Sequence, residues 1–198
     1  INERVSYSNY KPEIKKVSNG SYLSHLIIGN IAYSRTNEKR LPLLLLNNIL
    51  GGPALNSRLN LSLREKYGYA YSIESMYQPY SDTGMFGIYL GTDNRNIEKS
   101  IKVVKKELKN LRDTKLGTSQ LSKAKKQLAG QLAIQYESRQ NEMLAIAKSH
   151  LYRTRVKSLK DFLVEIDGLT SESIIEVANE IFAEEQLSML IFEGKEND

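Results

Sequence analysis

The sequence predicts an α+β domain in which a single β-sheet packs against a layer of helices. All four prolines lie within the first 79 residues, a distribution that predicts strands and turns first and long helices afterwards. Strand-like segments are few and are separated by segments with helical periodicity, which favours one sheet with a helical layer. The chain has 198 residues, of which 40% are hydrophobic and 26% charged. This composition is typical of a globular chain with one domain, or at most two small ones.

The first third of the chain contains an irregular segment, one strand and two helices. Residues 1–21 are polar, and we expect a tail or linker before a domain that covers residues 22–198. The opening residues INERVSY contain neither an initiator Met nor a signal peptide, so we interpret the chain as a piece of a longer protein or a mature form. β-Branched and aromatic residues over 21–33 predict a strand. Helices are expected at about 41–50 and 55–68, ended by Gly51 and Gly68 respectively.

The rest of the chain is expected to form a hairpin, a series of helices and a closing strand. The turn sequence QPYSD separates two strand-like segments, which predicts a β-hairpin. The sequence KLGT interrupts the helical pattern that follows, and Thr170 is a typical cap for a later helix. The expected strands are 69–77, 84–92 and 187–193, and the expected helices are 95–112, 119–138, 140–151 and one that follows Thr170.

Several kinds of site are excluded by composition. The chain has no cysteine, which excludes disulfides, Cys-based zinc sites and thiol nucleophiles. The two histidines, His25 and His150, lie 125 positions apart in the sequence, so a zinc site built from clustered histidines is also excluded. The longest apolar run, residues 41–46, is too short to cross a membrane, so we expect no membrane span. The sequence gives no indication of the cellular compartment.

Charge is distributed unevenly along the chain. Residues 99–126 contain ten Lys or Arg, whereas residues 161–198 contain eleven Asp or Glu. A basic face can bind nucleic acid, but no aromatic residue lies within 90–135 to stack on bases. Apolar residues over 97–111 repeat at helical spacing, so we interpret the lysines as the solvated side of an amphipathic helix and expect no nucleic-acid partner. The basic and acidic stretches are candidates to face each other in the fold.

Tyrosine is concentrated in one segment, with six of twelve within residues 67–89. Alternation along the strand 69–77 places Tyr69, Tyr71 and Tyr77 on one face, together with Ile73 and Ser75. This face is either packed in the core or forms a wall for an extended ligand. Arg64 lies near the end of the preceding helix and is expected to point toward the same region. An Arg and a Tyr are hydrogen-bond donors suited to a peptide carbonyl, a carboxylate or a developing oxyanion.

An ordered set of short motifs resembles the C-terminal homologous half of the pitrilysin, insulinase and mitochondrial processing peptidase family. The motifs are Leu-Gly-Gly at 50–52, Ser-Arg-Leu at 57–59, Arg-Glu at 64–65, Gly-Tyr-Ala-Tyr-Ser at 68–72 and Asp-Thr-Gly at 82–84. The segment 119–138 is similar to the following helix of that family, and 24–29 to its opening strand. The resemblance covers roughly residues 22–193.

The resemblance implies half of a zinc metalloendopeptidase. In that family two homologous halves close like a clamshell around a chamber, and the N-terminal half carries the zinc motif. The C-terminal half supplies an Arg and, seven residues later, a Tyr that hold the peptide substrate. Arg64 and Tyr71 match this spacing, so they are the expected substrate-binding residues.

This chain lacks the zinc motif, so the resemblance implies no catalytic or metal-binding residue here and zinc on a companion domain or subunit. By itself the chain should be inactive. The alternative is a non-catalytic scaffold subunit with the same fold.

Overall fold

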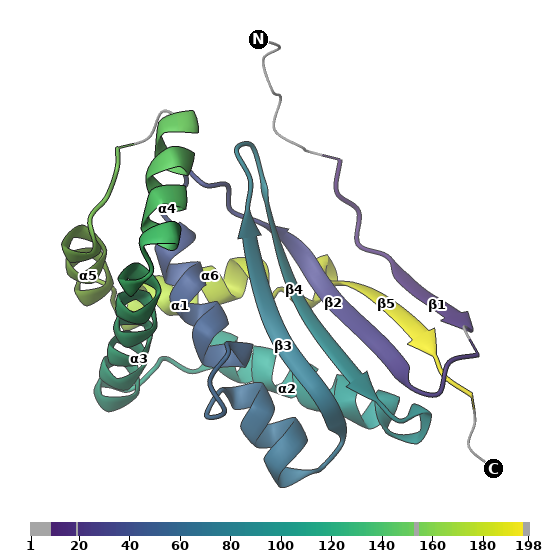
Figure 1. Ribbon diagram of the computed structural model, residues 1–198. Helices are drawn as coiled ribbons and strands as arrows, with labels where there is room; N and C mark the ends of the chain where they lie inside the picture. The colour runs from purple at the N-terminus through teal and green to yellow at the C-terminus, as the bar shows by residue number, and fades with distance from the viewer. Residues whose placement is uncertain (1–8, 19, 153–154, 196–198) are drawn as a thin grey trace.

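The structure is a computed structural model that describes residues 9–18, 20–152 and 155–195. Figure 1 shows one β-sheet with the helices gathered on one of its faces. The sheet has five strands in the order β1-β5-β2-β4-β3. This arrangement confirms the predicted α+β class with a single sheet and a helical layer. The strands are β1 (Ile14–Ser18), β2 (Ser24–Ala32), β3 (Ala70–Pro79), β4 (Gly84–Thr92) and β5 (Ser188–Glu193).

All neighbouring strands are antiparallel except β1 and β5, which are parallel. β3 and β4 form the predicted hairpin, and the backbone N–H of Tyr80 donates to the carbonyl of Thr83 at 2.8 Å in its turn. The helices are α1 (Arg40–Gly51), the π-helix η1 (Asn60–Lys66), α2 (Ile97–Asp113), α3 (Thr118–Glu137), α4 (Arg139–Leu151), α5 (Leu159–Asp167) and α6 (Ser171–Ile181), with short 3₁₀ turns η2 (Asn94–Asn96) and η3 (Glu184–Gln186).

The core lies between the sheet and the helices, and alternation along the strands builds it. Leu26 and Ile28 on β2 and Phe86 on β4 are fully buried, whereas Ile27 and Met85 on the opposite face of the sheet are exposed. The rings of Phe86 and Phe182 pack with their centroids 4.9 Å apart, which joins the sheet to the end of α6. One face of the sheet is therefore in the core, and the other carries apolar side chains that reach solvent.

α2 is the amphipathic helix that the sequence predicts. Its apolar residues Ile97, Ile101, Val104, Leu108 and Leu111 are buried. Two lysines of the basic stretch contact the acidic part of the chain: Lys105 on α2 lies 2.6 Å from Glu184, and Lys115, just after α2, lies 3.0 Å from Glu172. The expectation that the basic and acidic stretches face each other is confirmed at these two contacts. In the described part of the chain, no helix has both the length and the apolar character needed to cross a membrane.

β1 differs from the irregular tail expected over residues 1–21. The carbonyl of Glu13 accepts a hydrogen bond from the Met189 backbone N–H at 2.8 Å, and Ile14–Ser18 then pair along β5. Tyr10 also reaches this strand, with its hydroxyl 2.8 Å from the Ser188 hydroxyl. β1 is at the sheet edge and is largely exposed, so its sequence lacks the apolar alternation that marks a half-buried strand.

Candidate functional site

Arg64 and Tyr71 lie on either side of a tight turn that joins η1 to β3. Gly68 forms this turn with φ of 62°, a left-handed conformation that favours glycine. Its N–H donates to the carbonyl of Arg64 at 3.2 Å, and the N–H of Tyr69 donates to the carbonyl of Leu63 at 2.8 Å. Leu63 is fully buried. Backbone hydrogen bonds and a buried leucine thus fix the path of the chain between the two predicted site residues.

A β-bulge places Tyr71 on the outside of the sheet. Ala70 pairs with Thr92, and the next pair joins Ser72 to Gly91, so Tyr71 has no partner residue on β4. Ala70 is buried in the core, whereas the Tyr71 side chain is 63% exposed. An extra residue in one strand reverses the alternation of side chains that precede it.

The prediction of a shared tyrosine face is therefore wrong at Tyr71. Ile73 and Tyr77 pack against the core and Ser75 is buried, as the alternation requires. Tyr69, before the bulge, also packs partly against the core. The bulge thus separates an outward tyrosine from the tyrosines that stabilise the sheet.

The hydroxyl of Tyr71 donates a hydrogen bond to the carboxylate of Asp93 at 3.0 Å. Because the carboxylate holds the phenolic proton, this bond raises the pKa of Tyr71 above its usual value of 10.0. Arg95 lies on the other side of Asp93, with its guanidinium 3.8 Å from the same carboxylate oxygen. Asp93 itself is 8% exposed. Tyr71 is thereby held as a neutral donor beside a nearly buried carboxylate.

Arg64 projects from η1 into solvent. Among the described residues, no carboxylate lies within 4.0 Å of its guanidinium, and no hydrogen bond or ring contact joins it to Tyr71. The two side chains are both accessible near the end of the sheet where β3 begins, but they do not touch.

Aromatic rings and lysines continue this surface. Tyr67 and Tyr69 stack with ring centroids 5.2 Å apart, and the ammonium of Lys99 lies 5.7 Å from the Tyr69 ring. Asp93 and Lys99 are the neighbours that the sequence analysis does not identify. The hairpin register would have indicated Asp93, because it follows Thr92, the partner of Ala70.

Zinc does not fit the side chains that the structure describes. Within residues 9–18, 20–152 and 155–195, no three His, Cys, Asp or Glu side chains come together as a possible metal site. His25, one of the two histidines, instead lies 2.9 Å from the hydroxyl of Tyr89 through Nδ1. The surface that carries Arg64 and Tyr71 presents hydrogen-bond donors, of which the Tyr71 hydroxyl is directed at Asp93.

Comparison with known proteins identifies the family. Residues 3–128 match the family model described as "Peptidase M16 inactive domain". The chain belongs to the M16 peptidase family. This result confirms the resemblance seen in the motifs, because that family contains zinc proteases and a mitochondrial processing peptidase subunit.

Relatives of this M16 domain include proteins described as zinc proteases. The chain is 30% identical over 168 residues to the "uncharacterized zinc protease YmxG" of Bacillus subtilis, a match over 85% of this chain and 41% of the relative. It is 28% identical over 127 residues to the alpha subunit of the human mitochondrial processing peptidase, over 59% of this chain and 24% of that subunit. The chain thus spans less than half the length of these relatives.

Solved structures show the same fold. A peptidase M16 inactive domain from Pseudomonas fluorescens superposes with a TM-score of 0.88 at 22% identity, covering 98% of this chain and 47% of that one. A protease from Helicobacter pylori superposes with a TM-score of 0.82 at 20% identity, covering 98% of this chain and 48% of that one. The fold of this M16 domain is therefore shared with these two solved structures.

Proposed function

We propose that this M16 domain is the substrate-binding half of a zinc-dependent metalloendopeptidase. A companion domain or subunit would hold the zinc that activates water for peptide hydrolysis. This domain would close the chamber over the peptide and bind it through Arg64 and Tyr71. The observation that carries the proposal is the accessibility of both donors on either side of the Gly68 turn.

Each residue has a distinct part in this proposal. The Arg64 guanidinium has no carboxylate partner among the described residues, so its N–H groups are available to a peptide carbonyl. The Tyr71 hydroxyl is a neutral donor whose proton is directed at Asp93, and it would turn from this carboxylate toward the carbonyl. The exposed backbone of β3, at the edge of the sheet, supports binding of a peptide in extended conformation.

The test is reconstitution of the full chain with its zinc-bearing companion, followed by turnover of an unfolded peptide. Loss of one such donor costs roughly a hundredfold to a thousandfold in rate. We therefore expect Arg64→Ala and Tyr71→Phe each to lower kcat/KM by about this factor. The matched controls are Lys102→Ala on the exposed side of α2 and Tyr80→Phe at the hairpin turn, which we expect to retain the wild-type rate.

Two outcomes would contradict the proposal. Wild-type rates in both variants would exclude the assigned roles of Arg64 and Tyr71. Assembly of the complex without any peptidase activity, together with unchanged assembly of the variants, would instead support the alternative of a non-catalytic scaffold subunit.

A further inference from the structure

A hollow of about 1210 Å³ opens between α4, the start of α5 and the residues that precede α1. It lies at the N-terminal end of α1, whereas η1 and Arg64 follow the C-terminal end. A helix of 12 residues such as α1 is about 18 Å long, so the hollow is remote from the Arg64 and Tyr71 surface. Its volume exceeds the roughly 300–1,000 Å³ typical of sites for small molecules. The hollow is therefore large enough for a segment of polypeptide.

The walls of the hollow are predominantly cationic. Six lining side chains carry a positive charge and two carry a carboxylate. The positive charges come from separate parts of the chain, namely the residues before α1, the first residue of α1, helix α4 and the segment before α5. They are Arg35, Arg40, Arg139, Lys148, Arg155 and Lys157.

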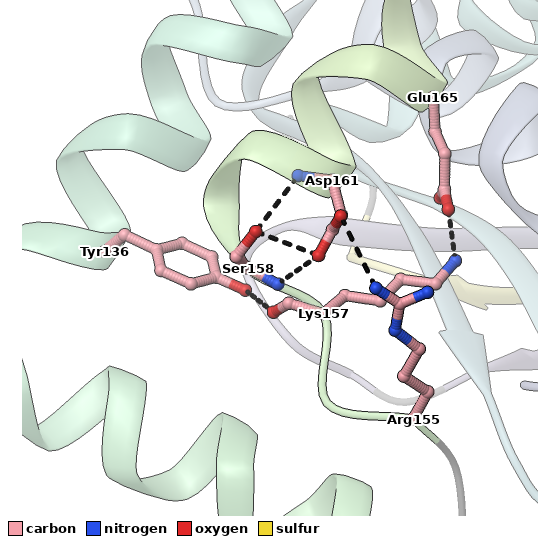
Figure 2. A network of polar contacts seen from close by, with 6 residues as sticks. All are labelled: Tyr136, Arg155, Lys157, Ser158, Asp161 and Glu165. Atoms are coloured by element: carbon pink, nitrogen blue, oxygen red, sulfur yellow. Dashed lines mark hydrogen bonds and ion pairs between the residues drawn. The ribbon is translucent and has the colours of Figure 1, made fainter.

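The carboxylates at the rim are already engaged. Figure 2 shows Asp161 held by Ser158 at the start of α5, with the guanidinium of Arg155 beside it, and Glu165 in contact with Lys157. The Lys157 ammonium lies 2.5 Å from the Glu165 carboxylate. Glu142, the other acidic lining residue, lies 2.8 Å from Arg139.

Three cations remain without such a partner. Within the described ranges, no carboxylate lies within 4.0 Å of the charged groups of Arg35, Arg40 and Lys148. The wall therefore has an excess of positive charge that its own carboxylates do not neutralise.

Arg35 carries a donor that the fold does not satisfy. Its guanidinium lies 4.3 Å from the centre of the Tyr152 ring, which fixes the side chain in the wall. Its Nε is buried and has no hydrogen-bond acceptor. A buried donor without an acceptor costs free energy; a bound segment could pair only with the other guanidinium N–H groups of Arg35, because Nε is not accessible.

Apolar side chains lie among these cations. Leu144 and Ile146 on α4 and Val156 beyond it are each more than 40% exposed and line the hollow. No residue of α4 is buried, so much of the apolar surface of this helix is open to solvent. A simple phosphate ligand would leave this apolar surface uncovered, whereas a peptide with apolar and acidic side chains would cover it while pairing with the cations.

We propose that this hollow binds an acidic, partly apolar segment of polypeptide. Its carboxylates pair with Arg35, Arg40 and Lys148, and its apolar side chains pack on Leu144 and Ile146. The inference does not depend on whether the bound segment is cleaved, because the hollow is separate from Arg64 and Tyr71.

The experiment measures binding of a fluorescent peptide of alternating Glu and Leu to the full chain by anisotropy. The double variant Arg40→Gln with Lys148→Gln is expected to weaken binding about tenfold, because two ion pairs are lost. A higher salt concentration is expected to weaken peptide binding by the wild type, and so to reduce the difference in affinity between the wild type and the double variant. Circular dichroism of the variant is expected to match the wild type.

The matched control is Lys102→Gln with Lys106→Gln, which removes the same charge from the exposed side of α2. We expect this control to bind the peptide as the wild type does. Equal weakening in both double variants would mean non-specific attraction and would overturn the proposal. Three other results would also overturn the proposal. They are wild-type affinity in the Arg40 and Lys148 double variant, equal affinity of the wild type for a Lys-Leu peptide, and displacement of the Glu-Leu peptide by inorganic phosphate at matched ionic strength.

Discussion

Tyr71 and Asp93 form a hydrogen-bonded pair whose protonation is set by the carboxylate. The Tyr71 side chain is exposed, but its hydroxyl lies 3.0 Å from the carboxylate of a nearly buried aspartate. The bond keeps the phenol protonated at pH values where a free tyrosine begins to ionise. The donor that the proposed function needs is thus maintained by a residue outside the recognised motif.

Replacing the carboxylate should lower the pKa of Tyr71. We expect Asp93→Asn to move this pKa back toward 10.0, because the negative charge that holds the proton is removed. Titration of the tyrosine NMR signals measures the shift, and the signal missing from Tyr71→Phe assigns it. An unchanged pKa in Asp93→Asn would show that the hydrogen bond does not control the phenol.

The location of Tyr71 shows a limit of strand alternation. The family motif indicates Arg64 and Tyr71 as substrate-binding candidates, and both side chains are exposed in the structure. Strand alternation placed Tyr71 on the wrong face because a bulge leaves no regular signal in the side-chain pattern. Asp93 could not be recognised as its neighbour without the register of β3 on β4.

At the scale of elements, the close contact between α1 and β3 depends on glycine. A Cβ on Gly51 would lie 2.8 Å from the backbone N of Ser75, and the Ser75 hydroxyl donates to the Asn47 carbonyl at 2.9 Å. The end of α1 therefore rests directly on the backbone of β3. This contact explains why the Leu-Gly-Gly motif lies at the end of that helix.

Gly51→Ala should destabilise the domain. The added methyl group meets backbone that can move only with the strand, and overpacking of this kind costs about 1–3 kcal/mol. Urea unfolding measures the change in the free energy of unfolding. The matched control is Gly130→Ala within α3, where nothing lies within 4 Å of the added carbon. This control is expected to stabilise the domain by about 0.5–1 kcal/mol, since alanine favours a helix. An equal change in the free energy of unfolding in both variants would show that the contact of Gly51 with β3 does not require glycine.

Long elements with a regular apolar pattern could be predicted from the sequence, whereas the exposed edge strand β1 and the nine-residue helix α5 were missed. α2 has a regular apolar stripe and was predicted within two residues of its observed ends. α5 was not predicted, although Ser158 and Asp161 form a capping box at its start. Only Ile166 is buried within α5. Its apolar residues Leu159, Phe162, Leu163 and Ile166 do repeat at helical spacing, so the sequence carried a signal that the analysis of longer segments passed over.

At the scale of the whole molecule, buried tyrosines couple stability to alkaline pH. Burial raises the pKa of Tyr77 to about 12, and burial together with a hydrogen bond to Glu180 raises the pKa of Tyr33. Hydrogen bonds to Glu176 and Glu180 also raise the pKa of Lys39. In all three groups the folded state holds the proton more tightly than the unfolded state.

Stability is therefore expected to fall at high pH. Above the ordinary tyrosine pKa of 10.0 the unfolded chain loses protons that the folded chain retains, so the free energy of unfolding decreases as the pH rises toward about 12. Urea unfolding over this range measures the decrease. Tyr77→Phe should make the decrease shallower, whereas Tyr22→Phe, at a side chain 74% exposed, should leave it unchanged. A wild-type free energy that stays constant over this range would contradict the expectation.

The order of strands in the sheet also constrains how the domain is made. β5 lies between β1 and β2, yet it is the last of the five strands to leave the ribosome. β2 is complete at Ala32, but its second neighbour begins only at Ser188. During synthesis, the backbone groups on that side of β2 therefore stay unpaired while more than three quarters of the chain is made. β1 also has no neighbouring strand until β5 has been synthesised. A nascent chain that stalls before Ser188 can form only the sheet β2-β4-β3, in which β2 is an edge strand whose open backbone groups can pair with another chain.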